Sequence, residues 1–194
     1  KFLFSIRRVV VLMMASGTFG ASASPRSPVN LLVNGMSNPL AIDRDAVCFT
    51  WMSDGSGRGE RQTAYEIVVA SSREDLAAGK FDFWDSGRVL SNRSASVEYR
   101  GRPLPAVRRF WWKVRVWDQT GRASLYSKAF SFDSGLTAED WTADYIWDGT
   151  TTVNHFSYFR KTFSIKCVPA SARVYVSAFR DYLLYCNGKL LGQG

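Results

Sequence analysis

Apolar and polar residues alternate with a period of two along several stretches of this chain, and this alternation constrains its fold more than any other feature. Val47, Phe49 and Trp51 mark one such stretch, and the pattern returns at residues 65–69 and along RFWWKVRVWD at 109–118. A period of two carried by β-branched and aromatic residues is typical of half-buried strands. The sequence therefore predicts an all-β protein.

Turn signals and one helix separate these strands. Residues 118–121 (DQTG) read as a turn, because Asp and Gly favour turn conformations. Residues 72–79 form the one predicted helix, with Ser72 as its cap, acidic residues in its first turn and a glycine at its end. Short strands with turns between them over about 100 residues describe an immunoglobulin or fibronectin type III-like β-sandwich, which we place at residues 29–133.

A second β module is predicted at residues 134–194. Gly135 and the capping pattern Thr137-x-x-Asp140 interrupt the strands between residues 134 and 140. Further strands are expected at 158–165, 172–178 and 182–186, and Asn187-Gly188 is a strong two-residue hairpin signal. So few strands cannot close a sandwich without unpaired edges, so we expect the truncated start of a module that continues beyond Gly194.

Residues 1–23 have the layout of a secretory signal peptide. A cationic start precedes an apolar stretch at 9–15 and small residues at 21–23, and cleavage is expected after Ala23. The apolar stretch is shorter than the roughly 20 residues that a membrane-spanning helix needs. We therefore expect a secreted or periplasmic protein without a membrane segment after cleavage, beginning with a Ser/Pro linker at 24–28.

The charge of the chain argues against a nucleic-acid partner. The net charge is +8, from 25 basic and 17 acidic residues. Removal of the signal peptide, which holds three basic residues and no acidic one, lowers the net charge to +5. The surplus is spread along the chain, whereas a nucleic-acid-binding surface gathers Lys and Arg on one element.

Three cysteines and one histidine limit the chemistry that the chain can host. Cys48, Cys167 and Cys186 make an odd number in an exported protein, and none lies in a metal-ligand spacing. Cys167 and Cys186 can form a disulfide if they face each other on neighbouring strands. We favour the interpretation that all three cysteines are small apolar residues of the core. With His155 as the single histidine, neither a His-based triad nor a multi-histidine metal centre can be assembled.

Two further sets of residues are candidate sites. Asp140, Asp144 and Asp148 recur every four residues, but their aromatic neighbours indicate irregular or extended chain, and solvated surface acids are favoured over a carboxylate pair or a calcium site.

The second set is aromatic: Trp84 on its own, and Trp111 and Trp117, which face away from Phe110 on the strand at 109–118 and can form a sugar platform or a docking surface. We favour the interpretation that neighbouring parts of the protein cover these rings, and we expect Lys113 and Arg115 to stack on them through cation–π contacts.

Seven stretches of the chain form a recognisable ordered set: residues 32–35 with 38–43, RQTAYEIVVASS at 61–72, WDSGRV at 84–89, YRGRPL at 99–104, RFWWKVRVWDQTG at 109–121, YFRKTF at 158–163 and YLLYCNGK at 182–189. Together they resemble the N-terminal region of the bacterial α-L-rhamnosidases, glycoside hydrolase family 78. The stretches between 38 and 121 are the more particular to rhamnosidases, whereas the pattern at 182–189 also occurs in other glycosidases. Cys186 departs from the larger apolar residue expected at its position.

The resemblance implies a division of labour. In that family, terminal α-L-rhamnose is hydrolysed with inversion by two carboxylates of an (α/α)6 barrel that follows the β modules. No catalytic residue, metal ligand or cofactor can be carried over to this chain, which is expected to be a non-catalytic fragment that docks on the barrel and meets the carbohydrate substrate only through it. The alternative is a secreted carbohydrate-binding or adhesion protein built of β-sandwich modules.

Overall fold

The computed structural model describes residues 24–54, 59–152, 155–169 and 172–194. The contacts divide the chain into two compact units, Lys1–Asp144 and Tyr145–Gly194. The expected signal peptide at 1–23 lies outside the described residues. Within the described residues, no helix has the length and apolar character needed to cross a membrane.

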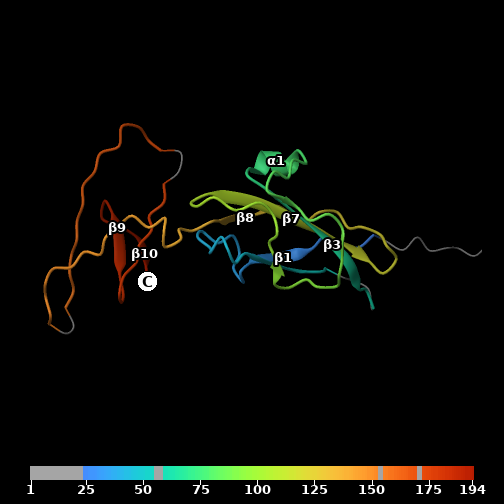
Figure 1. Cartoon of the computed structure of the whole chain (residues 1–194), viewed down its shortest axis with the longest axis horizontal. Coiled ribbons are helices and arrows are strands. Elements are labelled where there is room, and N and C mark those ends of the chain that lie inside the picture. Colours follow the sequence, from blue (N-terminus) through green and yellow to red (C-terminus); the bar gives the residue numbers. More distant parts are fainter. Residues whose placement is uncertain (1–23, 55–58, 153–154, 170–171) are drawn as a thin grey trace, which may run out of the picture. The chain divides into compact units, whose positions relative to one another are not determined.

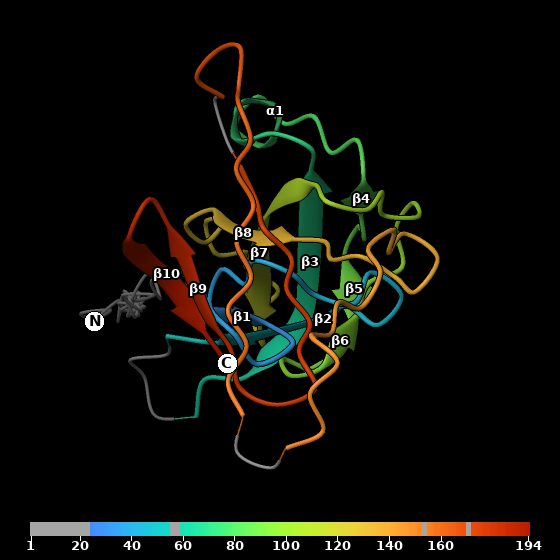
Figure 2. The ribbon, with the colours of Figure 1, turned by 90° about the vertical axis from the view of Figure 1, so that its left-hand side faces the viewer.

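The first unit is built from two antiparallel sheets (Figures 1 and 2). The three-stranded sheet has the order β1-β2-β6, with β1 at Val29–Val33, β2 at Cys48–Met52 and β6 at Val97–Glu98. The five-stranded sheet has the order β4-β3-β7-β8, and β5 also pairs with β3. Its strands are β3 at Gln62–Ala70, β4 at Trp84–Asp85, β5 at Val89–Leu90, β7 at Arg109–Asp118 and β8 at Phe130–Asp133.

Aromatic side chains from both sheets meet in the core. Phe49 and Trp51 of β2 face Phe110 and Trp112 of β7, and all four are at most 1% exposed. The ring centroids of Phe49 and Trp112 lie 4.5 Å apart. These residues are alternate positions of their strands, so the predicted faces of residues 47–51 and 109–118 are confirmed. The predicted all-β class, with an immunoglobulin-like sandwich, is likewise confirmed.

The five-stranded sheet is covered on its outer side as well. Helix α1, Arg73–Ala77, lies above β3 and β7 in Figure 1, on the side away from β1. Its Leu76 packs in a second buried cluster with Val68 and Ala70 of β3. Ser72 caps the helix by accepting a hydrogen bond from the backbone N–H of Asp75 at 3.0 Å, as predicted.

The free edge of β8 is blocked by the chain segment that comes after β1. Asn38 accepts a hydrogen bond from the backbone N–H of Ser131 at 2.8 Å, and the carbonyl of Pro39 accepts one from Asp133 at 2.9 Å. These bonds occupy donors that would otherwise be open to pairing with another strand.

The described residues of the second unit form one hairpin, made of β9 (Leu183–Cys186) and β10 (Lys189–Gln193). Asn187 and Gly188 connect the strands with φ values of 49° and 79°, as the predicted two-residue turn requires. The prediction of strands at 158–165 and 172–178 is wrong, because the described residues there are not paired in a sheet. None of the described residues of 145–194 is buried. The alternating apolar residues of these two segments therefore have no partner strand or covering layer that would hold them as strands. A jelly-roll-like start at 134–194 stays a prediction.

Candidate functional site

The outer face of the five-stranded sheet carries the aromatic residues that the sequence singled out. Trp111, Lys113, Arg115 and Trp117 are alternate residues of β7 and point away from the core. The Arg115 guanidinium carbon stands 5.0 Å from the Trp117 ring centroid, and that of Arg88 also stands 5.0 Å from it. Trp117 is 8% exposed, so its ring is not available to stack on a sugar.

Tyr126 extends this stack of cations and rings. Its ring lies 4.8 Å from the guanidinium carbon of Arg115 and 4.6 Å from Nζ of Lys113. Nζ of Lys113 also donates a hydrogen bond to the carbonyl of Leu76 at 3.0 Å, which fixes the ammonium beneath α1. Burial, and then the charge of Arg115, lower the pKa of Lys113. Arg115 in turn forms an ion pair with Glu66 on β3.

Two serines hold the segment that carries Tyr126 against β7. Oγ of Ser124 accepts a hydrogen bond from the backbone N–H of Val116, and Oγ of Ser127 accepts one from Val114, both at 3.1 Å. Their own N–H groups donate to the carbonyls of the same two valines at 2.8 Å. The segment thus runs along β7 without being a regular strand. Sequence reasoning missed it, although the spacing Ser-x-x-Ser was available as a signal.

The other two candidate tryptophans are also covered by the chain. Arg73 stands over the Trp111 ring at 5.5 Å, and Trp84 stacks on Phe49 with a centroid separation of 6.0 Å. The interpretation that neighbours within the protein cover these aromatics agrees with the structure: Trp117 is buried, and Trp84 and Trp111 are half-buried.

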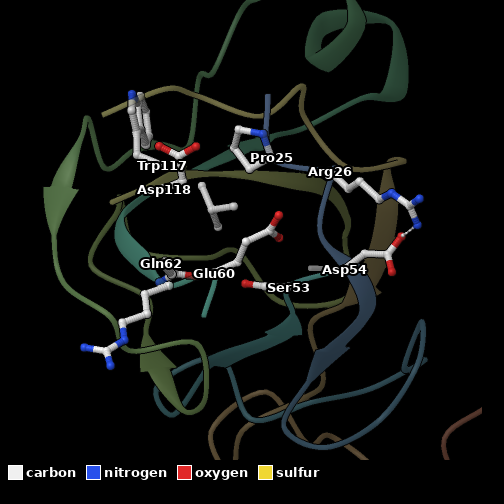
Figure 3. Close-up of a pocket in the computed structure, with 10 residues that line it drawn as sticks. Pro25, Arg26, Ser53, Asp54, Glu60, Gln62, Trp117 and Asp118 are labelled. Carbon is white, nitrogen blue, oxygen red and sulfur yellow. Dashed lines mark ion pairs between the residues drawn. The ribbon is translucent and has the colours of Figure 1, made fainter. Parts of the chain in front are cut away.

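A pocket of about 250 Å³ opens where β3 begins and β7 ends, beside Trp117 and Asp118 (Figure 3). Glu60 points its carboxylate into this space. An ion pair of 3.5 Å between Arg26 and Asp54 lies across from Asp118.

Asp118 is a structural carboxylate of the turn at 118–121. It accepts hydrogen bonds from the backbone N–H and the hydroxyl of Thr120 at 2.8 and 2.6 Å, and from the backbone N–H of Arg122 at 3.0 Å. Burial alone would raise the pKa of Asp118, but these bonds and the charge of Arg122 together lower it. A general acid must hold its proton at working pH, so Asp118 is unsuited to that role.

Asp148, His155 and Ser157 lie together in the second unit. Oδ2 of Asp148 is 2.7 Å from Nε2 of His155 and accepts a hydrogen bond from Oγ of Ser157 at 2.5 Å. Hydrogen bonds from Ser157 and from the backbone of Thr150, followed by the contact with His155, lower the pKa of Asp148. Ser157 and His155 both contact the same oxygen of Asp148, whereas nucleophilic catalysis needs a hydrogen bond between the serine hydroxyl and the histidine ring. The arrangement is therefore not that of a nucleophilic triad.

The other two candidate aspartates, Asp140 and Asp144, have different surroundings. Asp140 pairs with Arg44 at 3.2 Å and accepts hydrogen bonds from the backbone N–H and hydroxyl of Thr137, both at 3.0 Å. Asp144 is exposed. Asp140 and Asp144 of the first unit therefore do not form one site, and Asp148 belongs to the second unit. Within the described part of the chain, no group of three or more His, Cys, Asp or Glu side chains can hold a metal ion.

The cysteines form no disulfide, and the expectation of three small core residues is wrong for all three. Cys48 is half-buried on the outer side of β2, because its strand turns Phe49 and Trp51 to the core. Cys167 and Cys186 are exposed, because the second unit buries none of its described side chains.

Residues 28–138 match the family model described as the Rha78A-like, N-terminal immunoglobulin domain. The chain belongs to this family. The match spans all the strands of the two-sheet unit, so the Rha78A-like immunoglobulin domain is the sandwich described above.

Relatives of this Rha78A-like chain are α-L-rhamnosidases. One from Formosa agariphila is 30% identical over 99% of this chain, and one from Streptomyces avermitilis is 39% identical over 57% of it. The structure of α-L-rhamnosidase from Dictyoglumus thermophilum is 35% identical over 63% of the chain, with a TM-score of 0.60. That of the Streptomyces avermitilis enzyme complexed with L-rhamnose is 37% identical over 60%, with a TM-score of 0.57.

The Rha78A-like chain corresponds to a small part of these proteins. It spans 23% of the Formosa agariphila relative and 11% of the Streptomyces avermitilis one. It also covers 14% of the chain in the Dictyoglumus thermophilum structure. The chain is thus an N-terminal region of the α-L-rhamnosidase kind.

Proposed function

We propose that this chain is the non-catalytic front part of an exported α-L-rhamnosidase, which hydrolyses terminal α-L-rhamnose from glycosides with inversion. The observation that carries the proposal is the match of 99% of this chain to only 23% of a protein named α-L-rhamnosidase. In this proposal the catalytic barrel and its two carboxylates belong to the remaining length of the parent protein, and the carbohydrate substrate binds there.

The proposed organisation runs along the sequence. A signal peptide at 1–23 directs the protein to the periplasm or the outside of the cell, and 24–28 link it to the sandwich at 29–133. Residues 134–194 begin a second, jelly-roll-like module that is completed by polypeptide beyond Gly194. The exposed apolar side chains of the second unit support this last step, since Tyr158 and Phe179 are 97% and 96% exposed and isolated modules rarely leave so many rings in water.

The chemistry of two described carboxylates, those of Asp118 and Asp148, supports a non-catalytic role. An inverting glycosidase needs one carboxylic acid that keeps its proton and one carboxylate, about 6.5–9.5 Å apart on either side of the sugar. Asp118, which lies at the pocket, and Asp148, which lies in the second unit, both have lowered pKa values and accept hydrogen bonds from nearby residues with both of their oxygens. Neither is poised to protonate a glycosidic oxygen.

The experiment compares the 194-residue chain with the longer parent protein on an aryl α-L-rhamnoside. We expect turnover by the parent, release of rhamnose with inverted anomeric configuration by NMR, and no turnover by the chain. Hydrolysis by the chain alone would contradict the division of labour. A parent that binds polysaccharide without turnover would instead favour the carbohydrate-binding alternative.

A further inference from the structure

The linker at 24–28 lies against the end of the sandwich that holds the pocket. Pro28 is buried and Pro25 is half-buried, whereas Ser24 is exposed. Arg26 forms an ion pair of 3.5 Å with Asp54, just beyond β2. Pro25 and Arg26 also line the pocket of about 250 Å³. The chain therefore enters the pocket lining directly after Ser24.

Glu60 gives this pocket a carboxylate without a partner. Its side chain points toward the part of the pocket that Pro25 lines (Figure 3). Within the described part of the chain, no side chain or backbone N–H forms a hydrogen bond or an ion pair with this carboxylate. A carboxylate that lies in a hollow and is not paired attracts a nearby cation.

The other charged groups of the pocket leave this carboxylate unsatisfied. Arg26 is paired with Asp54. Asp118 is paired with Arg122 at 3.2 Å. Arg61 is the remaining charged residue of the lining, and its guanidinium forms no ion pair within the described part of the chain. The pocket can therefore accept one further positive group at its free carboxylate, and the charge of Arg61 limits how strongly that group is held.

Removal of the signal peptide supplies such a positive group at Ser24. In the uncleaved chain the nitrogen of Ser24 belongs to a neutral amide. Hydrolysis of the bond after Ala23 adds water across it, which leaves a carboxylate on Ala23 and an α-amino group on Ser24. The ordinary pKa of an α-amino group, roughly 7.7–8.0, keeps most of it protonated at neutral pH. Because a residue before proline is restricted to extended conformations, the new terminus has few orientations to lose when it pairs.

We infer that this pocket binds the amino terminus that export creates: the α-ammonium group of Ser24 pairs with the carboxylate of Glu60 in the mature protein. This rests on the cleavage after Ala23 in the proposed function. The pair fastens the front of the linker to the sandwich, next to the ion pair of Arg26 with Asp54. It forms only after the signal peptide is removed, so it distinguishes the mature protein from its precursor.

Titration of the amino terminus tests the pairing directly. The chain is prepared with Ser24 as its first residue and with ¹³C-labelled serine, and the Ser24 signals are followed by NMR between about pH 6 and pH 10. We expect Glu60 to raise the pKa of the α-amino group by about half a pH unit, the effect of an exposed ion pair. Glu60→Gln should return this pKa to its ordinary range. An ordinary pKa in the unmodified chain, or a raised one that Glu60→Gln leaves unchanged, would overturn the inference.

Two controls make the outcome specific. Glu98→Gln removes the same charge at the other end of β2, where Glu98 lies opposite Cys48, and it should leave the titration of Ser24 unchanged. An equal effect of Glu98→Gln and Glu60→Gln would mean that the overall charge of the chain sets the titration, and would overturn the inference. The NMR spectra of Glu60→Gln and of the unmodified chain should coincide away from the pocket, which excludes unfolding.

The first residue of the exported protein separates this inference from the proposed function. N-terminal sequencing of the protein purified from the secreting host should begin at Ser24. Another first residue would reject the proposed cleavage and, with it, the inference. A protein that begins at Ser24 but has an ordinary α-amino pKa would keep the proposed cleavage and overturn the inference alone.

Discussion

Arg109 and Asp133 form a two-point ion pair across β7 and β8. Nε of Arg109 donates to Oδ1 of Asp133 at 2.7 Å, and Nη2 donates to Oδ2 at 3.1 Å. The aspartate side chain is 1% exposed and that of the arginine 46%. The hydrogen bonds to Asp133 raise the pKa of Arg109. The pair therefore joins β7 to the last residue of β8, where the chain leaves the sandwich.

Replacing this arginine should destabilise the sandwich. Arg109→Ala removes two charge-assisted hydrogen bonds from a buried carboxylate, and we expect a loss of about 1–2 kcal/mol, since the arginine itself is half exposed. Urea unfolding followed by tryptophan fluorescence measures the loss. Arg100→Ala is the matched control, because its ion pair with Glu98 is exposed on both sides and should contribute almost nothing. Equal stability of the two variants would contradict the expectation.

Asp118 should make the sandwich sensitive to acid. Because its pKa is lowered in the folded chain from the ordinary value of 3.8, its contribution to stability is present above about pH 4 and is lost as the pH falls through the folded value. Melting temperatures between about pH 6 and pH 2 should fall less steeply for Asp118→Asn than for the unmodified chain. Parallel curves would show that the turn carboxylate contributes nothing to acid unfolding.

Ser124 and Ser127 should contribute through the donors that they satisfy. Ser127→Ala leaves the buried N–H of Val114 without this acceptor, and Ser124→Ala does the same for Val116, so each should cost about 1–3 kcal/mol. Both changes also release the segment that holds Tyr126 over Arg115. Urea unfolding measures the effect, and Ser24→Ala, at an exposed position, is the control. Losses no larger than that of the control would mean that water replaces the serine hydroxyls.

The sequence predicted the elements whose signal is local. The alternation at 109–118, the cap at Ser72 and the turn at Asn187-Gly188 each depend on neighbouring residues, and each is found where it was expected. Strands at 158–165 were not found, because alternation indicates which side chains share a face but does not supply a partner strand.

The candidate site was predictable only in part. The outward tryptophans of β7 followed from the period of two, but their covering by Arg88 and Tyr126 depends on segments distant in sequence. The hydrogen bonds of Ser124 and Ser127 that position Tyr126 likewise depend on which strand lies beside residues 122–129.

Gly101 should tolerate no side chain, although its backbone is ordinary. A Cβ at this position would lie 2.5 Å from the carbonyl oxygen of Phe83 and 2.5 Å from the hydroxyl of Tyr99. These groups are already bonded to the same loop, because Tyr99 donates to the carbonyl of Arg102 at 2.7 Å and the N–H of Arg102 donates to Phe83 at 3.0 Å. Gly101→Ala must therefore displace either backbone or a hydrogen-bonded ring.

We expect Gly101→Ala to cost about 1–3 kcal/mol, the usual range for overpacking a well-packed site. Burial raises the pKa of Tyr99 to about 12, with a further contribution from the charge of Asp82, so the same variant should bring its ionisation back towards 10 if the ring is pushed into water. Absorbance titration of the phenolate, with Tyr99→Phe to assign the signal, measures this shift. Gly192→Ala is the control, because a Cβ there meets no atom within 4 Å. An unchanged stability together with an unchanged titration would mean that the loop at 99–104 moves aside freely, and that the glycine in YRGRPL is not required by packing.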